Sequence, residues 1–204
     1  MRLLFLRKFL HETYCSGVAF AMIMRMRKAA LAAIGILAGF GTAPAWAAYQ
    51  PVGPQTNVPV ATVLAGGWSV CYTADFATPF GSNTATTLAG CTGDQIIVAA
   101  HLKGSDVYAV LAAAPKADAL MDTGTGTQAT HTVNGSEWYN SDNWAFGFAG
   151  AGDTVQLDSC DVTEGDDRFC VHTFTAVGGY RAGAQRDLNA DTNWEKVVLT
   201  NVSQ

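Results

Sequence analysis

Short apolar or alternating runs recur along the chain from residue 68 onwards, and Gly, Asn, Asp and Ser separate them. Runs of this length and spacing, without the long helical stretches that a parallel sheet needs, are typical of antiparallel sheets. We therefore expect an all-β fold of about eight short strands, either an antiparallel β-sandwich (jelly-roll-like) or a barrel. One helical turn is expected over residues 115–121. The expected strands are 68–72, 96–102, 106–113, 137–139, 144–148, 154–157, 168–175 and 194–200.

Aromatic residues gather in one of these strands, "WAFGFA" at 144–149. Side chains alternate between the two faces of a strand, so Trp144, Phe146 and Phe148 share one face. Burial of each ring contributes roughly 1.5–3 kcal/mol, whereas three exposed rings would form an aggregation-prone patch. The pattern predicts that the three rings form one wall of the core.

The neighbouring pair Trp138 and Tyr139 precedes a polar turn that contains Asn140 and Asp142. Consecutive residues of an extended segment point in opposite directions, so one of the two rings is expected at the rim of the domain. An aromatic ring can stack on the apolar face of a sugar while amide and carboxylate groups orient its hydroxyls. Trp138, Tyr139, Asn140 and Asp142 are therefore the predicted ligand-binding residues.

The first 47 residues have the order of features found in an export signal. A basic segment at 24–28 precedes an apolar run at 29–40, and the small residues Ala45 and Ala47 stand at the −3 and −1 positions of a cleavage site after Ala47. The apolar run is too short to span a membrane, which takes about 20 residues. We predict a signal peptide over 1–47 and a secreted or periplasmic protein.

The predicted leader is unusually long, which suggests that translation starts at Met24 or Met26. Behind it, residues 48–60 contain three prolines and little periodicity, as expected of an extended lead-in. Residues 61–204 show no repeat and no shift in composition, so we expect them to form a single β domain.

Removal of the leader makes the chain strongly acidic. The whole sequence has a formal net charge of −5, but residues 48–204 contain six basic and sixteen acidic residues. Phosphate backbones and anionic lipid surfaces would repel such a domain, so nucleic-acid binding is disfavoured. No later apolar run reaches spanning length, so no membrane insertion is expected after cleavage. Neutral ligands, such as a glycan of a cell surface, and cations remain as partners.

Four cysteines follow the leader: Cys71, Cys91, Cys160 and Cys170. An even number of cysteines in an exported chain indicates disulfides, and two disulfides allow three pairings. We favour Cys71–Cys91 and Cys160–Cys170, because both loops are short and each would join neighbouring predicted strands. A zinc site is the alternative, but the spacings of 20 and 10 residues match no common zinc module.

The stretch "DLNADTNWE" at 187–195 places oxygen-bearing side chains at every second position, as in loops that fold around calcium. The motif lacks the glycine and the final glutamate of an EF-hand loop, so an Asx-rich turn is the alternative. The candidate ligands are Asp187, Asn189, Asp191, Asn193 and Glu195.

A second acidic stretch at 158–167 lies almost wholly within the predicted Cys160–Cys170 loop. It could hold a cation or keep an exposed hairpin soluble, and most charge runs are of the second kind. Its carboxylates are Asp158, Asp161, Glu164, Asp166 and Asp167.

Common catalytic motifs are absent from the sequence, including the G-x-S-x-G elbow and the H-E-x-x-H zinc motif. A glycosidase needs two carboxylates at a suitable separation in space, which spacing along the chain does not reveal. Glu137, Asp142 and Glu164 are the candidates for such a pair, with no preference among them.

Several short motifs together resemble a group of secreted bacterial β-rich domains without an assigned activity, some of which carry sorting tails of the PEP-CTERM type. The resemblance implies an extracellular or surface-associated module and assigns no catalytic residues. The chain ends without such a tail. The motifs are "GWSVCY" (67–72), "DTG" (122–124), "NGSEWY" (134–139), "WAFGFA" (144–149), "SCD" (159–161), "GGYRAG" (178–183), "LN" (188–189) and "WEKV" (194–197).

Two functions are consistent with these features. The first is a non-catalytic binding or surface-interaction module that recognises a carbohydrate and is stabilised by calcium. The second is a secreted hydrolase, such as a glycosidase, that uses two carboxylates.

Overall fold

The structure, a computed structural model, describes residues 48–201. The predicted signal peptide and both candidate start sites lie outside the described residues. Within residues 48–201, no helix is long and apolar enough to cross a membrane.

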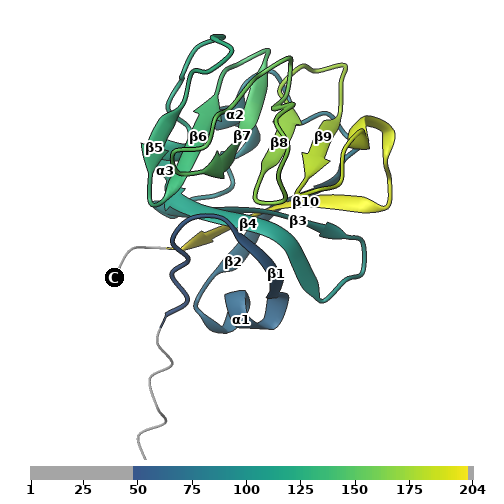
Figure 1. Cartoon of the computed structure of the whole chain (residues 1–204). Coiled ribbons are helices and arrows are strands. Elements are labelled where there is room, and N and C mark those ends of the chain that lie inside the picture. Colours follow the sequence, from purple (N-terminus) through teal and green to yellow (C-terminus); the bar gives the residue numbers. More distant parts are fainter. Residues whose placement is uncertain (1–47, 202–204) are drawn as a thin grey trace, which may run out of the picture. The chain divides into compact units, whose positions relative to one another are not determined.

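Two five-stranded antiparallel sheets make up the described part of the chain (Figure 1). Sheet A has the order β1 (Gln55–Pro59), β4 (Val107–Pro115), β3 (Gln95–Leu102), β10 (Trp194–Asn201) and β2 (Ser69–Asp75). Sheet B has the order β5 (His131–Val133), β6 (Ser136–Asn140), β7 (Ala145–Gly150), β8 (Phe169–His172) and β9 (Gly179–Ala182).

The expected all-β fold is confirmed, and the two sheets pack as a sandwich rather than closing into a barrel. Sheet B is a meander of consecutive strands, which differs from the paired Greek keys of a jelly roll. The segment 154–157 is not a strand and contributes only an isolated bridge from Leu157 to Asp161. Strands β1, β5 and β9 were not predicted, because they are short or contain proline and glycine.

Three short helices and one 3₁₀ turn connect the strands. α3 (Lys116–Ala119) lies inside the predicted helical turn, while α1 (Val60–Ala65), α2 (Thr84–Thr87) and the 3₁₀ turn η1 (Leu188–Ala190) were not predicted. β1 lies within the segment predicted as a lead-in and pairs with β4, so this segment belongs to sheet A.

The main core lies between the two sheets. Phe146 and Phe148 project from β7 into it, as predicted, and Phe148 stacks on Phe169 of β8 at 5.8 Å. Trp144 does not join them, which corrects the prediction of a three-ring wall. It precedes β7, is half-buried, and packs with the residues on the outer face of sheet B. Strict alternation does not extend into the turn before the strand.

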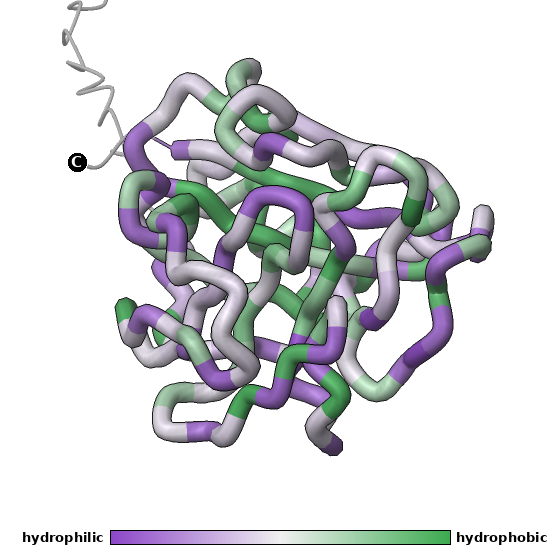
Figure 2. Tube along the Cα trace, turned by 90° about the horizontal axis from the view of Figure 1, so that it is seen from above, coloured by the Kyte–Doolittle hydropathy of each residue, from purple (hydrophilic) through white to green (hydrophobic). Residues whose placement is uncertain are grey.

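A second apolar layer lies on the face of sheet A that points away from sheet B. Trp68, Leu111 and Leu199 belong to it, and α1 covers this face in Figure 1. Figure 2 shows hydrophobic positions along the central strands and hydrophilic positions mainly in the loops. Sheet A is therefore buried on both faces, which explains why β3 and β4 are almost continuously apolar.

Both predicted disulfides are present, Cys71–Cys91 and Cys160–Cys170. The first ties β2 to the turn that precedes β3, and the second ties β8 to the loop 151–168 on the outer face of sheet B. Disulfides persist in oxidising compartments, so the pair fits an extracytoplasmic protein.

Five basic side chains that are at least partly buried donate to backbone carbonyls. Lys196, for example, is buried and donates to the carbonyls of Asp75 and Thr78 at 2.5 and 2.6 Å, and its burial lowers its pKa to about 8. Such bonds satisfy loop carbonyls that no strand pairs with. The five are Lys116, Arg168, Arg181, Arg186 and Lys196.

Candidate functional site

The predicted ligand-binding residues of β6 are enclosed by the protein. Trp138 is 0% exposed and its ring packs between Phe146 and Phe148, with centroids 6.3 and 5.3 Å away. Tyr139 is 1% exposed on the opposite face and donates its hydroxyl to the carbonyl of Phe169. Neither ring can stack on a ligand in this structure, which corrects the prediction of a rim position.

Asn140 and Asp142 are also committed to the fold. Asn140 is buried, accepts from the Thr84 hydroxyl and donates to the carbonyl of Leu120. Asp142 is exposed, but its two oxygens accept from the Asn83 amide and the Thr84 backbone N–H at the start of α2. These residues join α2 to the β6–β7 turn.

The three carboxylates considered for hydrolysis serve separate purposes. Glu137 accepts from the hydroxyls of Thr130 and Thr132 and from the backbone N–H of Gly152. Asp142 caps α2, and Glu164, 94% exposed, pairs with Arg186 at 3.2 Å. Glu137 is thus a structural acceptor whose oxygens are occupied, which is unsuitable for a general acid.

Burial raises the pKa of Glu137, but hydrogen bonds from Gly152, Thr130 and Thr132 outweigh it, so the net pKa is lowered from 4.5. A carboxyl group whose pKa is lower in the folded state stabilises the protein above its unfolded pKa, and this stabilisation is lost as the pH falls below it. Glu137→Gln should therefore lower the free energy of unfolding by about 1–3 kcal/mol at pH 7. Chemical denaturation of both proteins from pH 7 to pH 3 checks this.

We expect the two unfolding free energies to converge as the pH falls below about 4.5. Glu164→Gln, at an exposed position, should change the stability by less than about 0.5 kcal/mol and serves as the control. A difference between wild type and Glu137→Gln that stays constant down to pH 3 would contradict the assignment.

The predicted calcium loop is not formed. Asp187 has a left-handed backbone (φ 59°), Leu188–Ala190 form η1, and the Asp191 carboxylate accepts from the backbone N–H groups of Asn193 and Trp194. Glu195 faces His101 across the ladder of β10 and β3, with 3.4 Å between Oε2 and Nε2. No group of three or more His, Cys, Asp or Glu side chains in residues 48–201 could hold a metal.

The cationic groups bound by the second acidic stretch are the guanidinium groups of Arg168 and Arg181. Asp161 is 0% exposed and accepts from Arg168 at 2.6 Å, and Arg168 also contacts Asp153 at 3.0 Å. Arg181, also 0% exposed, donates to the carbonyls of Asp161, Thr163, Gly165 and Gly183. The loop is therefore packed against sheet B rather than solvated as a free hairpin.

A groove of about 200 Å³ lies between the edges of the two sheets, beside this loop. Sheet A contributes Thr56 and Asn57 of β1, Ala109 of β4 and Trp194 of β10. The other wall consists of Asp166 and residues 182–185, which follow β9. A space of this size accepts one ring-sized unit rather than a drug-sized ligand, which needs 300 Å³ or more.

Trp194 is half-buried, with part of its ring against the core and part along the groove. Asp191 positions Trp194, because the Asp191 carboxylate accepts a hydrogen bond from the backbone N–H of Trp194 at the turn that leads into β10. The carbonyl of Trp194 in turn accepts from the N–H of Phe76. The stretch predicted to bind calcium therefore acts as the turn that holds this ring.

Asn57 has a left-handed backbone (φ 55°) in the middle of β1. The register is the same on both sides of it, with the pairs Thr56 and Val110 and Val58 and Tyr108, so Asn57 stands opposite Ala109 of β4. A non-glycine residue in this conformation is uncommon and marks a position worth a functional test.

The opposite wall is held rigidly. Gly183 (φ 60°) donates its N–H to the carbonyl of Arg168 and accepts from Arg181, while Ala182 and Gln185 exchange backbone hydrogen bonds. A Cβ at position 183 would lie 3.0 Å from the carbonyl oxygen of Asp166, so glycine permits the close approach. Hydrogen bonds therefore fix the backbone of this wall.

Four polar side chains line the groove without an internal partner. Thr56, Asn57, Asp166 and Gln185 form no side-chain hydrogen bond or ion pair within residues 48–201. Their donors and acceptors are therefore free to bind a ligand, in contrast to those of Asn140, Asp142 and Glu137.

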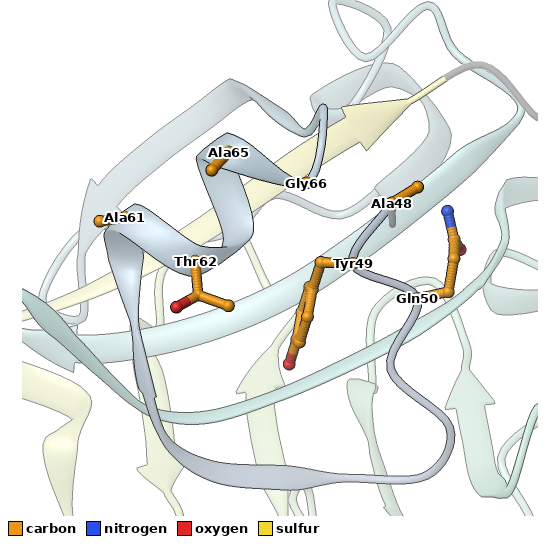
Figure 3. Close-up of a pocket in the computed structure, with 7 residues that line it drawn as sticks. All are labelled: Ala48, Tyr49, Gln50, Ala61, Thr62, Ala65 and Gly66. Carbon is orange, nitrogen blue, oxygen red and sulfur yellow. The ribbon is translucent and has the colours of Figure 1, made fainter. Parts of the chain in front are cut away.

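A second hollow, of about 500 Å³, lies between α1 and the segment before β1 (Figure 3). Alanines and Gly66 form much of its wall, and Thr62 of α1 points toward Tyr49 (Figure 3). Gln50 and Thr62 are its polar side chains apart from Tyr49, and no charged residue of the described chain lines it. Its ring is that of Tyr49, and it has neither a tryptophan nor a carboxylate, both of which the smaller groove has.

Comparisons with protein-family models, curated proteins and solved structures found no match. The resemblance to secreted bacterial β-rich domains therefore stays a prediction.

Sequence reasoning missed the groove, although it contained one signal for Trp194. A tryptophan directly after an Asx-rich turn starts a strand at its exposed end, where the ring remains partly accessible. Thr56, Asn57 and Gln185 carry no local signal, because sheet packing alone brings them near Trp194.

Proposed function

We propose that this protein is an exported, non-catalytic binding module that recognises a sugar unit in the Trp194 groove. The observation that carries the proposal is a half-buried tryptophan beside four polar side chains without internal partners. An aromatic face and a few convergent hydroxyl, amide and carboxylate groups are the chemistry that recognises a sugar. This proposal moves the predicted carbohydrate site from Trp138 to Trp194.

The charge of the protein supports a ligand that is not anionic. Residues 48–204 contain sixteen acidic and six basic residues, and five of the basic side chains are committed to loop carbonyls. Glycans of a cell surface or an extracellular matrix are partners that this distribution permits. No described feature favours the hydrolase alternative, because Glu137 and Asp142 are engaged in structural hydrogen bonds.

Trp194→Ala tests the site. Glycan-array screening of the purified protein, followed by calorimetric titration with the best ligand, should show binding that Trp194→Ala weakens about tenfold or more, a loss of ~1.4 kcal/mol or more. Loss of the stacking surface and of part of the groove wall is the physical reason.

Trp144→Ala is a matched control, because Trp144 is also half-buried but lies on the outer face of sheet B. It should retain the affinity of the wild type. A wild-type protein that binds no glycan, or a Trp194→Ala variant with unchanged affinity, would refute the proposal.

A further inference from the structure

We infer that the Trp194 groove selects sugars by charge, preferring a protonated amino sugar to a neutral one and rejecting a uronic acid, with Asp166 as the counterion. This inference rests on the proposed function, because it concerns the same groove.

Asp166 is the charged side chain among the described residues that line the groove. It is exposed and has no internal partner, so its carboxylate is available to a ligand. The other polar groups on the wall, those of Thr56, Asn57 and Gln185, are neutral. The Asp166 carboxylate would therefore attract an ammonium group of a ligand. It would repel a sugar carboxylate, and no cationic side chain among the lining residues would offset that repulsion.

The three arginines near the groove cannot act as receptors for an anion, and the exposed Lys103, whose backbone N–H donates to the carbonyl of Asn193, does not line it. Arg181 is fully buried, and its donors are directed to four loop carbonyls, including that of Gly183 beneath the groove. Arg186 donates to the carbonyl of Thr163 and pairs with Glu164. Arg168 is bound by Asp161 and Asp153. An anionic ligand could bind one of these arginines only by detaching it from its partners.

The buried guanidinium groups do contribute positive charge near the groove, but the loop as a whole is negative. Three arginines are accompanied by six acidic side chains, so the local field favours a cationic ligand. The residues are Arg168, Arg181 and Arg186 on one side, and Asp153, Asp158, Asp161, Glu164, Asp166 and Asp167 on the other.

An exposed ion pair changes an affinity by about 2- to 5-fold. We therefore expect glucosamine to bind the purified protein about 2- to 5-fold more tightly than glucose, and glucuronate to bind more weakly than both. The measurement is an NMR titration of the Trp194 indole N–H at low salt and at a pH that keeps the amine protonated, repeated with the galactose series. Higher salt should reduce the preference.

Asp166→Asn should abolish the preference for the amino sugar and retain binding of the neutral sugar. Asp158→Asn is the matched control, because Asp158 is an exposed acid of the same loop that does not line the groove. It should leave the preference intact.

Charge selection and sugar binding can be refuted separately. Equal binding of the three charge forms, or a preference that survives in Asp166→Asn, would overturn charge selection while sugar binding stands. If none of the sugars in either series shifts the Trp194 signal, sugar binding itself is refuted and charge selection with it.

Discussion

Arg181→Met is expected to lower the free energy of unfolding by about 3 kcal/mol or more, because a buried acceptor left without a donor costs about 1–3 kcal/mol and four carbonyls would lose this donor. Arg181 is 0% exposed and donates to the carbonyls of Asp161, Thr163, Gly165 and Gly183. Methionine fills a similar volume but donates nothing, so these acceptors would lose their partner inside the protein. Urea denaturation of both proteins gives the difference, and hydrogen exchange should show faster exchange in residues 161–168.

Two variants separate this effect from a general loss of charge. Arg186→Met removes a half-buried arginine that also donates to Thr163, and it should cost less than about 1 kcal/mol. Arg181→Lys keeps the charge but has one nitrogen in place of the planar fork, so it should recover only part of the loss. If Arg181→Met were as mild as Arg186→Met, the Cys160–Cys170 disulfide and the pair of Arg168 with Asp161 would hold the loop without Arg181.

Trp138→Ala is expected to lower the free energy of unfolding by about 3–5 kcal/mol, because it removes the largest ring of the core and leaves a cavity. The ring is 0% exposed and contacts Phe146 and Phe148 between the sheets. For a domain of this size, such a loss lowers the melting temperature by about 10 °C or more. Thermal unfolding followed by circular dichroism provides the measurement.

Trp194→Ala is the comparison, because the same side chain is truncated where it is only half-buried. Its cost should be clearly smaller than that of Trp138→Ala. If Trp138→Ala kept the wild-type stability and lost sugar binding, Trp138 would have to be accessible to a ligand, which the structure excludes.

Strands and disulfides were predictable because they depend on local patterns. The alternation in β7 placed Phe146 and Phe148 on the core side, and the short spacings between cysteines favoured the pairs that the structure shows. The same reasoning failed at Trp144 and at residues 154–157, where turns break the alternation. β1 was missed because proline and a left-handed asparagine hide its pairing with β4.

The fate of the polar clusters was not predictable, because it depends on which side chain from elsewhere in the chain meets them. In the sequence, Asp161 belongs to an acidic stretch. In the structure, Arg168, which directly precedes β8, donates to its carboxylate, and Arg181 of β9 donates to its carbonyl. Asp191 resembles a calcium ligand, but its oxygen accepts from the backbone of its own turn. Arg181 lies outside the local sequence window of Asp161, and a pattern of side chains does not show which backbone N–H groups a carboxylate will accept from.

By itself, the sequence determined the acidity of the domain, indicated an all-β fold and favoured the two disulfide pairs, since periodicity, charge and short loop closure act over a few residues. Tertiary structure alone decided which rings are buried and which one lines a groove, because burial depends on the sheet that packs opposite. It also brought Asn57, Asp166 and Trp194 together from three distant parts of the chain. Contacts between such distant segments are set by the packing of whole sheets, and no local pattern encodes them.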